Sequence, residues 1–319
     1  MDPGQNKSSS SPVGIRPVSM SHPEGFFALF KPSGLSSAGA LSLVKRILGA
    51  DKAGFLGTLD VPAMGVLPIA LGSATKLISF LPVSEKEYIG ELVLGISTIT
   101  DDMDGEVTDR RGATGVEDDA VKRAIETVAA QSEQVPPHVS AKQQEGVRGY
   151  KAMRAQGRLI DFAAVPVAIR QLAVLQERQD RDLRRIVFRM TVTPGFYVRG
   201  FCRDVGALLG CGACMGKLLR TKAQGFGVLD TLSLARLQRR AQSGDLSFLT
   251  WGETETGLLA TLPHIVLDDL QWTAFCHGLP VACAMEESTT SMVNRPDGRL
   301  GGVTEIRAGK AWPVRVFNE

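Results

Sequence analysis

Residues 54–68 read GFLGTLDVPAMGVLP and hold a single carboxylate, Asp60, among glycine, proline and apolar residues. The segment has no clean helical or strand period, so we expect residues 54–72 to form a tightly turned loop, a kind of element that often carries function. An ionised Asp between apolar neighbours needs a cationic partner, because desolvation raises the pKa of a carboxylate and an adjacent cation lowers it. Taken alone, these residues favour an Asp that caps a turn or a helix.

Periodicity predicts strands and helices on both sides of this loop. Short apolar or alternating runs predict strands at residues 26–30, 88–94 and 186–193. Helix signals predict three helices, which begin near Ser36, Glu117 and Pro194 and end near Gly49, Ala130 and Gly210. The apolar stripe of the third helix is formed by Phe201, Val205 and Leu208.

The two ends of the chain differ from this central part in composition and in hydrophobic pattern. Residues 1–22 are rich in Ser, Pro and Gly, and we expect a flexible tail there. After about residue 255 the chain has short β-like pieces between turn residues, which predict a small all-β module over residues 256–319. We therefore place the larger domain at residues 23–255.

Composition is that of a folded soluble protein. The chain has 319 residues, of which 44% are hydrophobic and 22% charged, and this length predicts about two domains. No apolar run approaches the roughly 18 residues of a membrane span, and the N-terminus has no secretory h-region. We expect a cytoplasmic protein that does not contact membranes.

Charge is distributed unevenly along the chain, although the net charge is only +2. Residues 84–135 hold 13 acidic and 5 basic side chains, whereas residues 140–225 hold 16 basic and 6 acidic ones. The basic segment could be a phosphate-binding face for a nucleic acid or an ordinary solvated surface. Charge alone favours neither.

Common catalytic and metal signals are missing from the sequence. It contains no GxxxxGK[ST], GxSxG or HExxH motif, and with four histidines the usual general base is scarce. The five cysteines are expected to be reduced thiols. The pair Cys211 and Cys214 has no second CxxC beside it, so we expect two buried apolar side chains and no metal site.

Several blocks that follow one another in order resemble the TruB-type tRNA pseudouridine synthases. The segment around Asp60 resembles their catalytic loop. The other matching blocks lie at residues 31–37 (KPSGLSS), 86–88 (KEY), 95–105 (GISTITDDMDG), 136–150, 195–199 (GFYVR) and 218–221 (LLRT). The resemblance covers about residues 25–225, and ordered blocks are far more specific than any single motif.

The resemblance implies an α+β fold with a mixed, largely antiparallel sheet, followed by a small C-terminal PUA-like domain that binds RNA. It implies that Asp60 is the nucleophile, that Tyr88 stacks on the base and assists proton removal, and that Arg199 pairs with Asp60. A bidentate guanidinium contact would keep Asp60 ionised. The expected substrate-binding residues are Lys31, which can also support the site, Phe55, Tyr197 and Leu218.

The implied reaction converts uridine to pseudouridine in the TΨC arm of tRNA, at position 55. It breaks the N1–C1′ bond and joins C5 to C1′ without redox change or energy input, so no cofactor is expected. Attack of the carboxylate at the sugar C1′ and at the base C6 both remain open. The base must first flip out of the RNA stack, at a cost of a few kcal/mol.

Three residues depart from the family pattern, which usually has His at Phe55, Pro at Val61 and Thr at Met64. Phe55 can stack or act as a wedge, but it cannot donate a hydrogen bond as His does. A noncatalytic RNA-binding or tRNA-folding protein on the same scaffold is therefore an alternative. Another is a catalytic subunit directed by guide RNA, which the short C-terminal module disfavours. We expect a monomeric enzyme that acts on the TΨC stem-loop.

Overall fold

The structure is a computed structural model, and it describes residues 23–139, 143–144, 147–148, 162–251, 259 and 262–317. The predicted tail at residues 1–22 and the predicted domain boundary near residue 255 lie outside the described residues. None of the described helices is long and apolar enough to span a bilayer.

The first predicted strand and helix are confirmed as β1 (Gly25–Lys31) and α1 (Ser37–Leu48). The Ser36 hydroxyl accepts a hydrogen bond from the backbone N–H of Gly39, which satisfies one of the free donors at the start of α1. The helix ends at Gly49, whose φ of 63° is the left-handed conformation that glycine adopts without a steric penalty.

The prediction of an irregular loop over residues 54–72 was wrong for most of its length. The structure contains β2 (Ala53–Phe55) and the buried strand β3 (Met64–Leu71), which pairs with β1 in antiparallel register. The Pro68 carbonyl accepts a hydrogen bond from the backbone N–H of Leu56, so the backbone N and O of Pro68 point away from β1. The missing N–H of Pro68 therefore costs no bond to β1. Only residues 56–63 are a loop.

The remaining elements up to residue 242 complete the first domain. They are η1 (Gly72–Leu77), β4 (Lys86–Leu94), β5 (Ile96–Thr98), β6 (Val107–Arg110), α2 (Asp118–Ala129), β7 (Glu133–Gln134), β8 (Gln143–Gln144), β9 (Val147–Arg148), β10 (Val165–Pro166), β11 (Ile169–Asp180), β12 (Leu183–Val192), α4 (Val198–Leu209), β13 (Ala213–Ala223), β14 (Phe226–Gly227), η2 (Val228–Asp230) and α5 (Leu234–Gln242).

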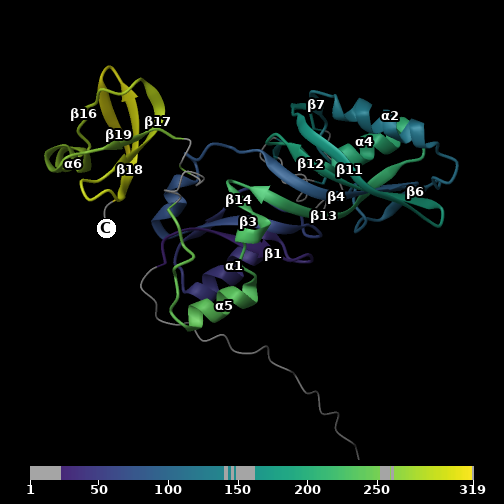
Figure 1. Ribbon diagram of the computed structural model, residues 1–319, viewed down its shortest axis with the longest axis horizontal. Coiled ribbons are helices and arrows are strands. Elements are labelled where there is room, and N and C mark those ends of the chain that lie inside the picture. The colour runs from purple at the N-terminus through teal and green to yellow at the C-terminus, as the bar shows by residue number, and fades with distance from the viewer. Residues whose placement is uncertain are drawn as a thin grey trace, which may run out of the picture.

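One eight-stranded sheet organises this domain. Its order is β1-β3-β13-β4-β12-β11, with β2 paired to β3 and β14 to β13. The contact between β13 and β3 is parallel and the others are antiparallel, which confirms the expected mixed, largely antiparallel sheet. Figure 1 shows α1 and α5 together near β1, and α2 and α4 together near β11 and β12. The central strands β13 and β4 lie between these two helix pairs.

The predicted helices at residues 118–130 and after Pro194 are confirmed as α2 and α4. One predicted core residue of α4 is wrong, because Leu208 is 55% exposed. The buried stripe is formed instead by Val198, Phe201, Cys202 and Val205. All five cysteines are free thiols, and Cys202, Cys211 and Cys214 are buried.

The C-terminal module is a second sheet, as predicted, and it has the PUA-like character expected of it. Its elements are β15 (His264–Val266), α6 (Asp269–Cys276), β16 (Val281–Ala282), β17 (Ser288–Asn294), β18 (Leu300–Arg307) and β19 (Lys310–Val316), with strand order β15-β17-β18-β19-β16. A shared apolar cluster joins the two domains. Phe26 and Leu77 of the first domain pack in it with Met292, Val303 and Phe317 of the second.

The acidic and basic segments of the sequence face each other in the fold. Ion pairs between residues 84–135 and 140–225 include Arg110–Asp182, Arg170–Glu85, Arg178–Glu91, Arg184–Asp118, Arg185–Glu91, Arg199–Asp102, Arg203–Asp101 and Lys222–Glu87. Seven basic side chains in the described part of residues 140–225 are therefore paired with carboxylates of residues 84–135. A phosphate-binding face and an ordinary solvated surface both stay predictions for this segment.

Candidate active site

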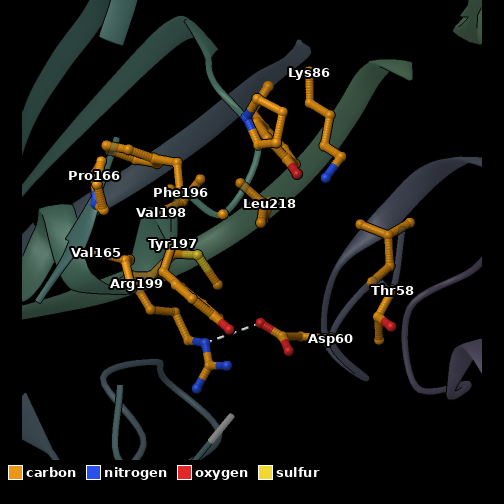
Figure 2. Close-up of a pocket in the computed structure, with 15 residues that line it drawn as sticks. Thr58, Asp60, Lys86, Val165, Pro166, Phe196, Tyr197, Val198, Arg199 and Leu218 are labelled. Atoms are coloured by element: carbon orange, nitrogen blue, oxygen red, sulfur yellow. Dashed lines mark ion pairs between the residues drawn. The ribbon is translucent and has the colours of Figure 1, made fainter. Parts of the chain in front are cut away.

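Asp60 and Arg199 meet although they lie far apart in the sequence. Asp60 is in the loop between β2 and β3, and Arg199 is in the first turn of α4. Arg199 Nε lies 2.9 Å from Asp60 Oδ2, as Figure 2 shows, and the two side chains are 5% and 39% exposed. The carboxylate of Asp60 thus contacts a buried guanidinium and keeps part of its surface accessible.

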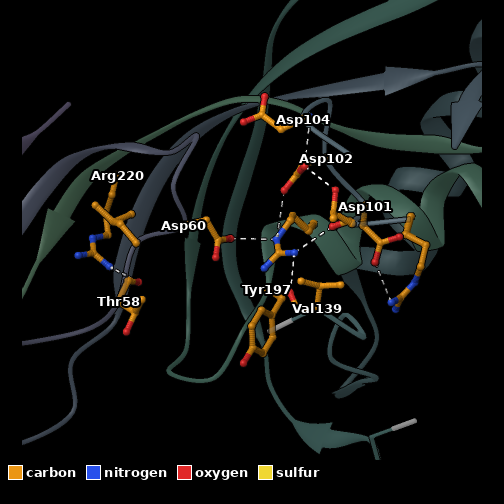
Figure 3. A network of polar contacts seen from close by, with 12 residues as sticks. Thr58, Asp60, Asp101, Asp102, Asp104, Val139, Tyr197 and Arg220 are labelled. Atoms are coloured by element: carbon orange, nitrogen blue, oxygen red, sulfur yellow. Dashed lines mark hydrogen bonds and ion pairs between the residues drawn. The ribbon is translucent and has the colours of Figure 1, made fainter. Parts of the chain in front are cut away.

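The predicted bidentate contact is wrong, because the guanidinium is shared among several acceptors. Arg199 Nη1 donates hydrogen bonds to the backbone carbonyls of Thr100 and Val139, each at 2.9 Å, so the contact with Asp60 is made by Nε (Figure 3). Asp102 Oδ2 lies 3.9 Å from the same Nε. Arg199 is thus fixed by two carbonyls and faces two carboxylates.

Asp102 belongs to the acidic turn that follows β5. Its carboxylate accepts hydrogen bonds from the hydroxyl of Thr100 and from the backbone N–H of Asp104. Burial raises the pKa of Asp102, while the Thr100 hydrogen bond and Arg199 oppose the rise. The turn therefore supplies a carbonyl and a carboxylate around Arg199.

Arg220 fixes the backbone of the Asp60 loop, which we define as residues 57–63. This fully buried residue of β13 donates hydrogen bonds to the carbonyls of Gly57 and Val66, both at 2.8 Å, and to that of Thr58 at 3.4 Å. A register shift in β13 between Arg220 and Lys222 changes the direction of the strand at this point. One side chain therefore holds the start of the Asp60 loop and the strand β3 that follows it.

Two residues from the start of the chain hold the middle of the Asp60 loop. The Ser37 hydroxyl donates to the carbonyl of Leu59 at 3.0 Å and accepts from its N–H at 2.9 Å. Lys31 Nζ donates to the carbonyls of Leu35 at 2.6 Å and Val61 at 3.3 Å. These contacts fix the backbone on each side of Asp60, so its carboxylate is positioned before any substrate arrives.

A cavity of about 560 Å³ opens beside the ion pair, which is within the range of small-ligand sites. Tyr88, Leu218 and Tyr197 line it together with Asp60 and Arg199. The other lining residues are Thr58, Leu59, Lys86, Val165, Pro166, Pro194, Gly195, Phe196, Val198 and Met215. The cavity thus combines one carboxylate with aromatic and apolar walls.

Tyr88 is a buried residue of β4, and Arg220 is opposite it on β13. Burial raises the pKa of Tyr88, and the neighbouring Arg220 lowers it only in part. The phenol is therefore protonated at neutral pH. This state suits an aromatic surface and a hydrogen-bond donor better than a resident base.

Tyr197 is held by a residue that sequence reasoning missed. The side-chain amide of Gln134 donates to the Tyr197 carbonyl at 3.0 Å and accepts from its N–H at 2.8 Å. Gln134 lies in a two-residue strand without a recognisable motif. Arg220 and Ser37 did lie inside the blocks quoted above, but a sequence does not show which carbonyls they bind.

Two of the predicted substrate-binding residues do not line the cavity. Lys31 is fully buried and bonded to backbone carbonyls, so the expectation of substrate contact is corrected to the supporting role. Phe55 lies in β2 opposite Ile69 of β3. Tyr197 and Leu218 are at the cavity, as are Asp60, Tyr88 and Arg199.

Comparison with known proteins gives a consistent result. The model of the TruB family pseudouridylate synthase N-terminal domain matches residues 45–198. A protein of Nostoc sp. named tRNA pseudouridine synthase B is 32% identical over 92% of this chain and 98% of its own length. The chain belongs to the TruB family. It is a pseudouridine synthase, as the motif blocks predicted.

Other comparisons extend this assignment. The tRNA pseudouridine synthase B of Ruegeria sp. (strain TM1040) is 35% identical to this TruB-family chain, covering 92% of it and 96% of the relative. Among solved structures, a Cbf5-Nop10-Gar1 complex has a chain with a TM-score of 0.66 at 21% identity, covering 94% of this chain and 89% of that one. A chain of an H/ACA RNP bound to a substrate RNA gives 0.62 at 20% identity, covering 92% and 85%. These likenesses support the fold.

Proposed function

We propose that this enzyme isomerises uridine to pseudouridine in the TΨC arm of tRNA, at position 55, with Asp60 as the nucleophile. The observation that carries this proposal is the placement of Asp60. Its carboxylate is paired with a buried arginine and faces a cavity large enough for one nucleoside. The names of the curated relatives support tRNA as the substrate.

The chemistry needs no external reagent. The N1–C1′ bond breaks, the uracil turns, and C5 joins C1′. One proton leaves C5 and one is gained at N1, so the atoms balance without redox change. Asp60 can attack C1′, which releases the uracil as an anion, or add to C6, which places the negative charge on the uracil ring. In both routes Arg199 holds the attacking carboxylate in position. Tyr88 and Leu218 form the surface on which the uracil stacks and turns.

Proton removal from C5 calls for a base, and Tyr88 is the aromatic group placed to assist. Because burial keeps its phenol protonated, we propose stacking as its main role. To accept the C5 proton, the phenol would first give its own proton to N1 after the glycosidic bond has broken. At that stage Asp60, freed from the covalent intermediate, is a second possible acceptor.

The RNA must present its uridine outside the stack. We propose that residues 256–319, the PUA-like domain, bind the tRNA backbone, and that Phe55, which precedes the Asp60 loop, acts as an apolar wedge on the RNA. Residues 23–255 then form the catalytic domain. A monomer acting on a stem-loop in the cytoplasm is sufficient for this scheme, because every group named in it comes from one chain.

Mapping of the product tests the proposal. Purified protein is incubated with unmodified tRNA transcripts, and pseudouridines are located by carbodiimide modification and primer extension. We expect one new pseudouridine, at position 55, and the same product on the isolated TΨC stem-loop. Modification at another position would contradict the substrate assignment, and tRNA folding without any pseudouridine would favour the noncatalytic alternative.

A further inference from the structure

Lys86 is a charged residue of the cavity wall to which the proposed reaction gives no role. It lies on β4 two residues before Tyr88, so both side chains point to the same face of the sheet, about 7 Å apart along the strand. Its side-chain stem packs against the Asp60 loop, since a Cβ added at Gly57 would lie 3.3 Å from Lys86 Cε and 3.5 Å from Nζ. Figure 2 shows Lys86 on the side of the cavity away from Arg199.

No carboxylate of the described residues pairs with this ammonium group. Its sequence neighbours are engaged elsewhere. Glu85 pairs with Arg170, and Glu87 accepts a hydrogen bond from Thr221 and pairs with Lys222. Asp60 is held by Arg199. A half-buried cation without a counterion is unfavourable, and a bound anion stabilises it.

Among the described residues that line this cavity, Lys86 and Arg199 are the positively charged ones. Arg199 contacts Asp60 and two carbonyls, whereas Lys86 has no hydrogen bond or ion pair to a described residue. Burial and the nearby Arg220 lower the pKa of Lys86, with burial the larger cause. An anion bound beside Nζ would raise the pKa of Lys86 again, because it favours the charged ammonium.

We infer that Lys86 Nζ binds an RNA backbone phosphate next to the flipped uridine. The inference rests on the proposed function, because a uridine whose base lies on Tyr88 and Leu218 and whose sugar faces Asp60 carries its two flanking phosphates to the rim of the cavity. Lys86 then fixes the direction in which the strand crosses the site. A phosphate contact of this kind is made equally in the ground state and the transition state, so it acts on binding.

The expected kinetic signature follows from that. Lys86→Gln raises KM for a TΨC stem-loop about 10- to 100-fold, as expected for a lost charge-assisted hydrogen bond, with kcat close to that of the parent. Lys86→Arg keeps the positive charge and should restore much of the lost affinity for the stem-loop. The melting temperature of Lys86→Gln stays the same or rises, because an unpaired, half-buried charge is removed.

A chemical double-mutant cycle tests the contact directly. Stem-loops carry an uncharged methylphosphonate at the linkage 5′ or 3′ to the target uridine, and kcat/KM is measured by tritium release for the parent and for Lys86→Gln. At one linkage we expect the parent to lose activity and the variant to lose almost none. Lys222→Gln is the control. This exposed lysine of the neighbouring strand should show the same methylphosphonate effects as the parent.

The outcomes separate this inference from the proposed function. If the parent releases tritium from the unmodified stem-loop, but the effects of Lys86→Gln and methylphosphonate are additive at both linkages, the phosphate contact is refuted and the function stands. A fall in kcat with unchanged KM would equally refute it. If the parent is inactive on every stem-loop, the proposed function fails first.

Discussion

Arg199 is positively charged at a position where only 5% of its side chain is exposed, and this placement determines which substitutions the site can tolerate. Its planar fork reaches the carbonyls of Thr100 and Val139 as well as the carboxylate of Asp60. A lysine has the same charge but delivers it from one point on a flexible stem. Charge alone therefore does not fulfil the role of this residue.

Arg199→Lys should lower kcat about 100-fold while leaving tRNA affinity near the parent value, because a misplacement of Asp60 by about 1 Å is enough for such a loss. The measurement is single-turnover tritium release together with filter binding. Arg203→Lys, one turn further along α4 and paired with Asp101, is the matched control and should stay close to the parent. Equal effects of the two substitutions would argue against a special role for Arg199.

Lys31 predicts an unusual dependence of stability on pH. Burial lowers its pKa from 10.5 to about 8, with Arg220 adding to the effect and Asp60 opposing it. Between pH 8 and 10.5 the unfolded chain therefore binds more protons at this residue than the folded one, so the contribution of Lys31 to stability increases as pH rises through this window. Below pH 8 both states are protonated and the contribution is constant.

Lys31→Met removes this titration. Denaturant unfolding is measured at pH 7.5, 9 and 10. As pH rises, the free energy of unfolding of the parent should increase relative to that of the variant, by on the order of a few kcal/mol at most. Taking the difference between parent and variant cancels the other groups that titrate in this range. A difference that is flat or falls with pH would show that Lys31 is not buried as the structure has it.

At the scale of elements, β3 and β13 place the Asp60 loop. Gly65 of β3 has a φ of +113°, and a Cβ there would lie 2.2 Å from the carbonyl oxygen of Arg220 on β13. No side chain fits between the two strands at this point. The close approach brings Arg220 beneath the loop that it holds.

Gly65→Ala should therefore destabilise the protein by at least about 2 kcal/mol more than Gly244→Ala, as judged by denaturant midpoints. Gly244 also has a positive φ, of +70°, but nothing lies within 4 Å of its Cβ position. Both substitutions place a side chain at a positive φ, and Gly65→Ala adds the clash with β13. Similar losses for the two variants would contradict the close packing of β3 against β13.

Element by element, sequence reasoning succeeded where an apolar run or a helical period is uninterrupted. The apolar run of β1, the helical period of α1 and the strand β4 were read correctly. In contrast, β3 is buried along its length and contains Pro68, so it shows neither alternation nor a proline-free run. β11 is mostly exposed and has no apolar pattern to find. The motif blocks located Asp60, Tyr88 and Arg199, but not the carbonyl partners of Arg220 and Ser37.

At the scale of the whole molecule, two long-range features could not be predicted from local patterns. One is the pairing of the acidic segment at residues 84–135 with the basic segment at residues 140–225, which requires the register of β4, β11, β12 and β13. The other is the apolar cluster that joins the C-terminal sheet to β1 and η1. This cluster makes the PUA-like domain part of the stability of the whole chain.

Phe317→Ala tests that coupling. The ring is 4% exposed in the shared cluster, with Lys76 Nζ 5.9 Å from its centroid. Truncation should cost about 3–5 kcal/mol and lower the melting temperature of the whole protein in a single calorimetric transition. A separate early transition of the C-terminal domain, with the main transition unmoved, would show that the two domains are independent.

The reaction itself depends on the carboxylate of Asp60. Asp60→Asn keeps the shape of the side chain and removes its charge, and the loop backbone stays held by Arg220, Ser37 and Lys31. The decisive measurement is tritium release from tRNA labelled at C5 of uridine, made alongside filter binding of the same tRNA. We predict that release falls by at least about 1,000-fold while binding stays close to the parent. Substantial turnover by Asp60→Asn would contradict the assignment of Asp60 as the nucleophile.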